Sequence, residues 1–263
     1  MHAFCALLWD NASCGGKRTD VIRVEERSIM HGTRGQRKKS QDEKELGQHH
    51  TRNLFPGKTM LEIGDSSRNV VERIFRATST DTTRCSINIK QVFKLNNSKE
   101  TLERFEKFRE DVKNRAYEHY HKHPRNMVDG NEQLLFYGTK LTSCKQFGTS
   151  KLCKDSNCSI CSILKSDFYT AKKKSGIWLT SNCQDIVNAY ANTNANVETM
   201  SAKIAIMVCR VITGRVTDNM LDSSNYEGEY DSIGGVKSNQ LFVKDPSAIL
   251  PCFVIILNCK YFC

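Results

Sequence analysis

The sequence has no long hydrophobic run. None of its segments reaches the roughly 18 consecutive apolar residues that a membrane-spanning helix needs. The short apolar run at residues 3–9 ends at Asp10 and has no Lys or Arg before it, whereas a secretory signal starts with a positively charged segment. The sequence therefore predicts neither a membrane partner nor secretion.

The sequence also lacks a zinc finger, because His49 and His50 have no cysteine pair at finger spacing near them. It does contain 12 cysteines. Without a secretory route these residues are expected to stay reduced, as free thiols or as metal ligands. We therefore expect a protein of the nucleus or the cytosol.

Basic residues outnumber acidic ones, 39 to 29, and the formal net charge is +10. Much of the excess lies in residues 140–174, which hold eight lysines against two aspartates, and a second basic run occupies residues 34–39. Such runs are most often solvated surface. A basic balance also favours anionic partners such as nucleotides, nucleic acid or acidic proteins.

The first part of the chain differs in composition from the rest. Residues 1–57 are rich in Gly, Ser, Gln and mixed charges, without apolar periodicity after Ile29, so we expect a poorly ordered, basic and polar tail. Apolar patterning begins at Met60. We predict one domain at residues 58–263, with a lysine- and cysteine-rich insertion loop at residues 140–175.

Strand and helix patterns alternate within this domain. Apolar residues alternate over residues 87–95 and run on continuously over residues 202–216, and both patterns indicate strands. The apolar run at residues 249–257 indicates another buried strand, in which Pro251 predicts an edge position or a bulge. A helical repeat of apolar residues follows a capping sequence at Asn97. The mixture predicts an α+β fold.

Residues 131–140, NEQLLFYGTK, hold the most informative pattern. Leu134, Leu135 and Phe136 form a short apolar run of the buried-strand type, which ends near Gly138. Glycine lets the backbone turn and lets a ligand approach, because it has no Cβ. We therefore predict a central strand with a ligand-binding end.

This strand resembles the nucleotide-binding strand of the poly(ADP-ribose) polymerase (PARP) catalytic domain, which usually reads Leu-Phe-His-Gly-Thr or Leu-Phe-His-Gly-Ser. Further segments resemble that family in the same order from residue 58 to the C-terminus. They are residues 89–109, 176–178, 231–232 and 239–243. The details are most similar to a plant group of PARP-like proteins, some of which carry a two-Cys-two-His finger upstream. The resemblance implies an ADP-ribosyltransferase fold, with two packed, mainly antiparallel sheets and flanking helices.

The resemblance also implies where a ligand would bind. The family uses a His-Tyr-Glu set: the histidine holds a ribose hydroxyl, the tyrosine stacks on nicotinamide and the glutamate stabilises developing positive charge. The corresponding positions here are Tyr137, Trp178 and Gln240. Candidate residues for binding NAD are Gly138, Thr139, Trp178 and Tyr190, the last lying near the family's second stacking tyrosine.

All three positions of the set depart from the family, and each departure has a physical consequence. Trp178 keeps a flat aromatic surface for stacking. Tyr137 is longer than histidine and would crowd the ribose. Gln240 has no negative charge, and removing one such preorganised electrostatic group costs about 3 kcal/mol of transition-state stabilisation. Efficient catalysis is therefore not expected. The aromatic residues either hold a planar ring or fill a vacated pocket.

Four cysteines in the basic loop form a separate pattern. Cys144, Cys153, Cys158 and Cys161 are separated by eight, four and two residues, and the last pair is a Cys-x2-Cys knuckle. Four thiolates suit tetrahedral zinc. The alternative is a set of buried or unpaired thiols.

Three functions therefore remain open at this point. The first is a degenerate ADP-ribosyltransferase domain that serves as a binding or interaction module, with protein partners. The second is an active NAD-dependent mono-ADP-ribosyltransferase with unusual residues. The third is a nucleic-acid-binding protein that uses the basic cysteine loop.

Overall fold

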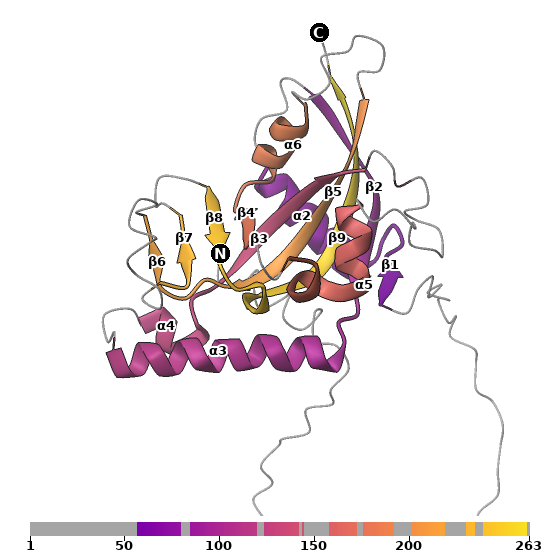
Figure 1. The fold of residues 1–263 in the computed structure, drawn as a ribbon. Coiled ribbons are helices and arrows are strands. Elements are labelled where there is room, and N and C mark those ends of the chain that lie inside the picture. The colour runs from indigo at the N-terminus through magenta and orange to yellow at the C-terminus, as the bar shows by residue number, and fades with distance from the viewer. Residues whose placement is uncertain are drawn as a thin grey trace, which may run out of the picture.

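The computed structural model describes residues 57–79, 85–119, 124–141, 144, 158–172, 176–191, 201–218, 230–234 and 239–261 (Figure 1). All but the last residue of the expected tail at residues 1–57 lies outside the described residues, and so does Cys153. The helices, strands and contacts of the structure all belong to the described ranges.

The described strands form one nine-stranded sheet, in the order β1-β2-β9-β5-β3-β4-β8-β7-β6 (Figure 1). Every neighbouring pair is antiparallel except β6 and β7. The strands are β1 Lys58–Met60, β2 Cys85–Leu95, β3 Glu132–Lys140, β4 Ile177–Thr180, β5 Ser201–Ile212, β6 Val216–Thr217, β7 Ser232–Ile233, β8 Gln240–Val243 and β9 Ile249–Tyr261.

Five α-helices of the described ranges accompany the sheet, so the predicted α+β class is confirmed. They are α2 Ser66–Ala77, α3 Lys99–His119, α4 Pro124–Asp129, α5 Ser159–Lys172 and α6 Cys183–Ala191, with a 3₁₀ turn at Pro246–Ala248. Figure 1 shows the long helix α3 running across one end of the sheet.

The two separate sheets expected from the sequence are instead one sheet. Its two halves meet where β3 pairs with β4, and only Phe136 and Thr180 are register partners there. On its other side β3 pairs with β5 along its whole length. In the antiparallel register Leu179, Trp178 and Ile177 continue towards residues 137–139, but they have no partners on β3. After Thr180 the chain turns into α6, where the Asn182 side chain accepts a hydrogen bond from the Gln184 N–H.

The core is centred on β5 and β9, which lie in the middle of the sheet. The side chains of Ile204, Ile206 and Ile255 are each 0% exposed, as the long apolar runs predicted. Pro251 lies in β9 and pairs only with β5, because the pairing of β9 with β2 stops at Phe253. Cys209 pairs with Pro251 and Val208 with Phe253, so the predicted bulge is confirmed.

Two local expectations need correction. The long helix is capped by Ser98, whose Oγ accepts the Thr101 N–H at 3.2 Å, and not by Asn97. The Asn97 amide instead donates to the Pro251 carbonyl at 2.9 Å. The second correction is that residues 140–175 are not a loop throughout, because α5 lies within them. Its Ile160, Ile163 and Phe168 are buried and recur at helical spacing.

A buried ion-pair cluster attaches β3 to its neighbours. The Glu132 carboxylate binds Arg210 of β5 at 2.6 and 3.0 Å and Arg109 of α3 at 2.6 Å. Both guanidinium groups also lie over the ring of Phe105, at 5.2 and 5.4 Å. Burial alone would lower the pKa of Arg210, but the hydrogen bond and charge of Glu132 raise it above its ordinary value. Glu132 therefore compensates two buried cations.

We predict that Glu132→Gln lowers the free energy of unfolding by about 3 kcal/mol, because it leaves the largely buried Arg210 without its carboxylate and Arg109 with Glu106 alone. Urea denaturation measures this loss. The control is Glu110→Gln, which removes an exposed ion pair with Lys113 and should change stability by less than about 0.5 kcal/mol. Equal effects of the two variants would contradict the role assigned to Glu132.

Candidate functional site

Tyr137, at the position of the family histidine, packs into the core. Its ring meets Phe168 of α5 edge-on, with 5.3 Å between ring centroids. Burial raises the pKa of Tyr137, and the nearby Tyr190 and Cys209 act in the same direction, against a hydrogen bond with Ser159. The phenol is therefore held between α5 and the sheet, as a neutral group with its own protein neighbours.

Gly138 is covered by α6. A Cβ at this position would lie 2.1 Å from Cγ2 of Ile186, so only glycine fits. The Tyr190 hydroxyl donates to the Gly138 carbonyl at 3.0 Å. Since β4 has no register partner on β3 beyond Phe136, side chains of α6 occupy the place next to this backbone. The predicted ligand-binding end of the strand is thus filled by the protein itself.

Trp178 and Gln240 lie on β4 and β8. Trp178 is 47% exposed, and its ring is 5.2 Å from that of Phe242 at an angle of 51°. Trp178 pairs with Phe242 and Thr180 pairs with Gln240, so all four side chains project from one face of the sheet. Gln240 is exposed.

The register separates Tyr137 from the other two positions of the set. Phe136 is the partner of Thr180 and therefore shares the face of Trp178 and Gln240. Tyr137, its neighbour in the strand, projects from the opposite face. The structure thus brings Trp178 and Gln240 together and places Tyr137 elsewhere. Thr139 lies further along β3, opposite Ala205.

Sequence reasoning missed the residues that fill the site. They are Phe168, which packs on Tyr137, Ile186, which covers Gly138, and Phe242, which packs on Trp178. One signal was present: Phe242 follows Gln240 by two residues in a strand and so had to share its face. Phe168 and Ile186 come from the helices α5 and α6, and the local pattern does not encode how these helices dock on the sheet.

Three of the four predicted metal ligands lie together. The Sγ atoms of Cys144, Cys158 and Cys161 are within 4.8 Å of one another, and those of Cys144 and Cys161 are 3.5 Å apart. Cys158 and Cys161 stand three residues apart where α5 begins, so their side chains lie on one side of it. All three thiols are buried. The group is close enough to hold a metal ion.

Two basic features adjoin the three thiols. Lys58 is 2% exposed; burial lowers its pKa, and the charges of Cys161 and Cys144 act in the opposite direction. A cleft of about 230 Å³ also reaches Cys144. Its other lining residues are Lys90, Gln91, Leu141, Lys203, Ile256 and Asn258.

The other described cysteines differ from this group. Burial raises the pKa of Cys183 to about 12 and that of Cys209 well above its ordinary value, so both are protonated at neutral pH. Cys252 and Cys259 are buried in β9. These four thiols act as small apolar side chains, as expected from their positions.

Comparison with known proteins gives no family assignment. No family model matches the chain, and no curated protein matches it significantly. None of the helices in the described ranges is long and apolar enough to cross a membrane.

We predict that Gly138→Ala destabilises the fold by about 2 kcal/mol, because the added methyl group collides with Ile186. In urea denaturation, Ile186→Ala should relieve this collision, so that the double variant loses less stability than the sum of the single losses. Val187→Ala, on the same helix, is the control and should be additive with Gly138→Ala. Additivity in both cycles would show that α6 does not cover Gly138.

Proposed function

We propose that residues 58–263 form a degenerate, PARP-like ADP-ribosyltransferase domain that acts as an interaction module in the nucleus or cytosol, without efficient catalysis. The observation that supports this most is the state of Gly138. The Ile186 side chain occupies the space that a Cβ at position 138 would need, and the Tyr190 hydroxyl donates a hydrogen bond to the Gly138 carbonyl. A nucleotide approaching this strand would have to displace both side chains.

The chemistry of the three set positions supports the same conclusion. Gln240 is neutral, so it supplies no charge to a cationic transition state. Tyr137 is packed against Phe168 and projects from the face opposite Gln240. These two groups therefore cannot act on one ribose without rearrangement of the strand. Trp178 keeps an exposed aromatic surface and remains available for stacking by a partner.

We predict that NAD does not raise the melting temperature of the natural chain and that labelled NAD does not modify it. The reference is the variant Tyr137→His with Trp178→Tyr and Gln240→Glu, which restores the family's residues. A control, Asn239→Asp, adds the same negative charge one residue away. If labelled NAD modifies the natural chain or a substrate, whatever the activity of the restored variant, the chain is an active mono-ADP-ribosyltransferase and our proposal is wrong.

The cysteine group favours a second element of function, a structural zinc site. We propose that Cys144, Cys158 and Cys161 bind one zinc ion, with Cys153 as the fourth ligand. The support is the proximity of three buried Sγ atoms and the preference of zinc for four thiolates in closed structural sites. A protonated Lys58 beside Cys144 and Cys161 would offset part of the negative charge of a four-thiolate zinc site.

We predict about one zinc ion per chain by metal analysis of purified protein, as expected for one four-thiolate site. Cys158→Ser should lose the zinc and lower the melting temperature, because metal binding contributes to folding. Cys252→Ser, a buried thiol outside the group, should keep it. Loss of zinc in Cys153→Ser would identify the fourth ligand. A metal-free natural chain as stable as the zinc-loaded one would exclude the site.

A further inference from the structure

A bulge in β2 lies at the cleft that reaches Cys144. On one side of the bulge Ile89 pairs with Leu257, and on the other side Gln91 pairs with Ile256. Lys90 is therefore an extra residue, with no register partner on β9. A bulge of this kind interrupts the ladder and re-aims side chains, and bulges are frequent next to functional sites.

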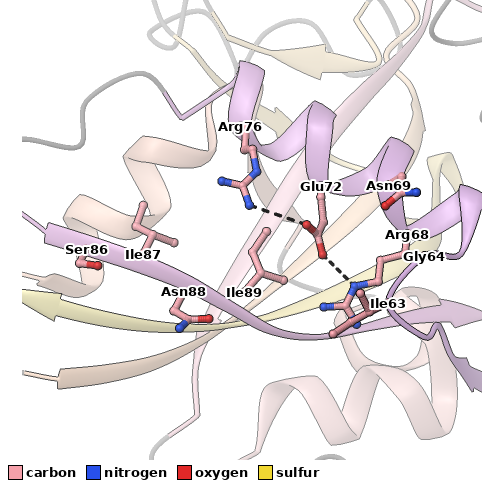
Figure 2. Close-up of a pocket in the computed structure, with 10 residues that line it drawn as sticks. All are labelled: Ile63, Gly64, Arg68, Asn69, Glu72, Arg76, Ser86, Ile87, Asn88 and Ile89. Atoms are coloured by element: carbon pink, nitrogen blue, oxygen red, sulfur yellow. Dashed lines mark hydrogen bonds and ion pairs between the residues drawn. The ribbon is translucent and has the colours of Figure 1, made fainter.

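The bulge brings two consecutive polar side chains to one face of the sheet. Figure 2 shows Ile87 and Ile89 pointing from β2 towards α2, so Lys90 projects from the other face. In a regular strand Gln91 would return to the α2 side. It instead shares the face of Lys90, and both residues line the cleft of about 230 Å³.

The neighbouring strands add a second cation and a second amide to this cleft. Lys203 of β5 pairs with Asn258 of β9, so their side chains share a face, and both line the cleft. Leu141 and Ile256 add an apolar lining, since they are only 7% and 6% exposed. None of the described residues that line the cleft is acidic.

The cleft between β2 and α2, drawn in Figure 2, differs in how its charges are compensated. There Glu72 binds Arg68 at 2.8 Å and Arg76 at 3.7 Å. Lys90 and Lys203 are exposed, and neither forms an ion pair with another described residue. Of the two clefts, the one at the bulge is therefore the one suited to an anion.

We propose that the cleft at the bulge binds the phosphate group of a small molecule. Lys90 and Lys203 offset its charge, which is about −1.5 to −2 for a phosphate monoester at pH 7, and lysine is a common phosphate binder. The amides of Gln91 and Asn258 donate hydrogen bonds to its oxygens. The cleft volume is several times the roughly 30 Å³ of one water molecule, which leaves room for an ester substituent.

The inference goes beyond the proposed function, because it involves neither the NAD site nor zinc. Phosphorus NMR titrations of the full chain test it, with inorganic phosphate and phenyl phosphate as probes at constant ionic strength. Saturable binding at one site per chain is expected. Tighter binding of phenyl phosphate would identify an ester as the ligand, and tighter or equal binding of inorganic phosphate would identify the free anion. If neither probe binds saturably, the proposal is wrong.

Single substitutions locate the binding. Lys90→Gln and Lys203→Gln should each raise the dissociation constant about tenfold, because each removes a charged contact. Lys94→Gln is the control: it removes the same charge from β2 outside the cleft and should leave the constant unchanged. The zinc content of each preparation is measured as well, since Cys144 borders the cleft. Equal weakening by all three substitutions would show a response to net charge alone and overturn the proposal.

Deletion of Lys90 tests the bulge itself. Ile89 and Gln91 then become neighbours and can keep their partners Leu257 and Ile256 in a regular ladder. Stability in urea should therefore not fall, whereas phosphate binding should weaken at least as much as in Lys90→Gln. A folded deletion variant that binds phosphate as tightly as the natural chain would contradict the proposal. If the deletion variant does not fold, Lys90→Gln and Lys203→Gln decide.

Discussion

β4 has a register partner on β3 at a single position, Phe136 opposite Thr180, and the candidate site depends on that short junction. Beyond it the β3 backbone needs other partners, since a buried carbonyl without a hydrogen bond is costly. The Tyr190 hydroxyl meets this need at Gly138, and Ile186 closes the space beside it. The space beside β3, where β4 does not pair with it, could hold a ligand in principle. In this structure the helix α6 occupies that space. The buried cluster around Glu132 holds the start of β3 in place, so α6 packs against a fixed strand.

The three buried thiols bring together parts of the chain that are distant in sequence. Cys144 follows β3, Cys158 and Cys161 stand where α5 begins, and Lys58 comes from β1. A metal ion bound there would join the segment after β3 to α5, the helix that packs on Tyr137 through Phe168. The thiols and Tyr137 therefore belong to one layer of packing on the α5 face of the sheet, whereas α6 covers Gly138 on the opposite face. Disturbance of the thiols is expected to reach Tyr137 through α5.

The sequence was most informative where the pattern is local and strong. The long runs in β5 and β9 and the alternation in β2 predicted strands correctly, because burial on one or both faces leaves a direct trace in the order of residues. The helix α5 was missed, because its lysines and cysteines obscured the helical spacing of Ile160, Ile163 and Phe168.

The expectation of two sheets failed because strand pairing is non-local. A single register pair joins the two halves, and no local pattern marks it. For the site, the proximity of three cysteines was predicted from spacing, whereas the cover over Gly138 came from a helix about 50 residues away in sequence.

Loss of charge and loss of space have different consequences for a nucleotide site. A site that lacks only the charge of a glutamate can still bind its ligand, because stacking and backbone hydrogen bonds do not need that charge. A site whose space is filled by other side chains cannot bind its ligand, whatever residues surround it.

In this chain the neutral Gln240 is a difference of the first kind, and the packing of Ile186 and Tyr190 around Gly138 is a difference of the second kind. Because the two changes arise from different elements, β8 and α6, restoring the charge alone leaves the obstruction in place. For the proposed interaction module, the filled strand end is therefore a stronger argument than the neutral Gln240.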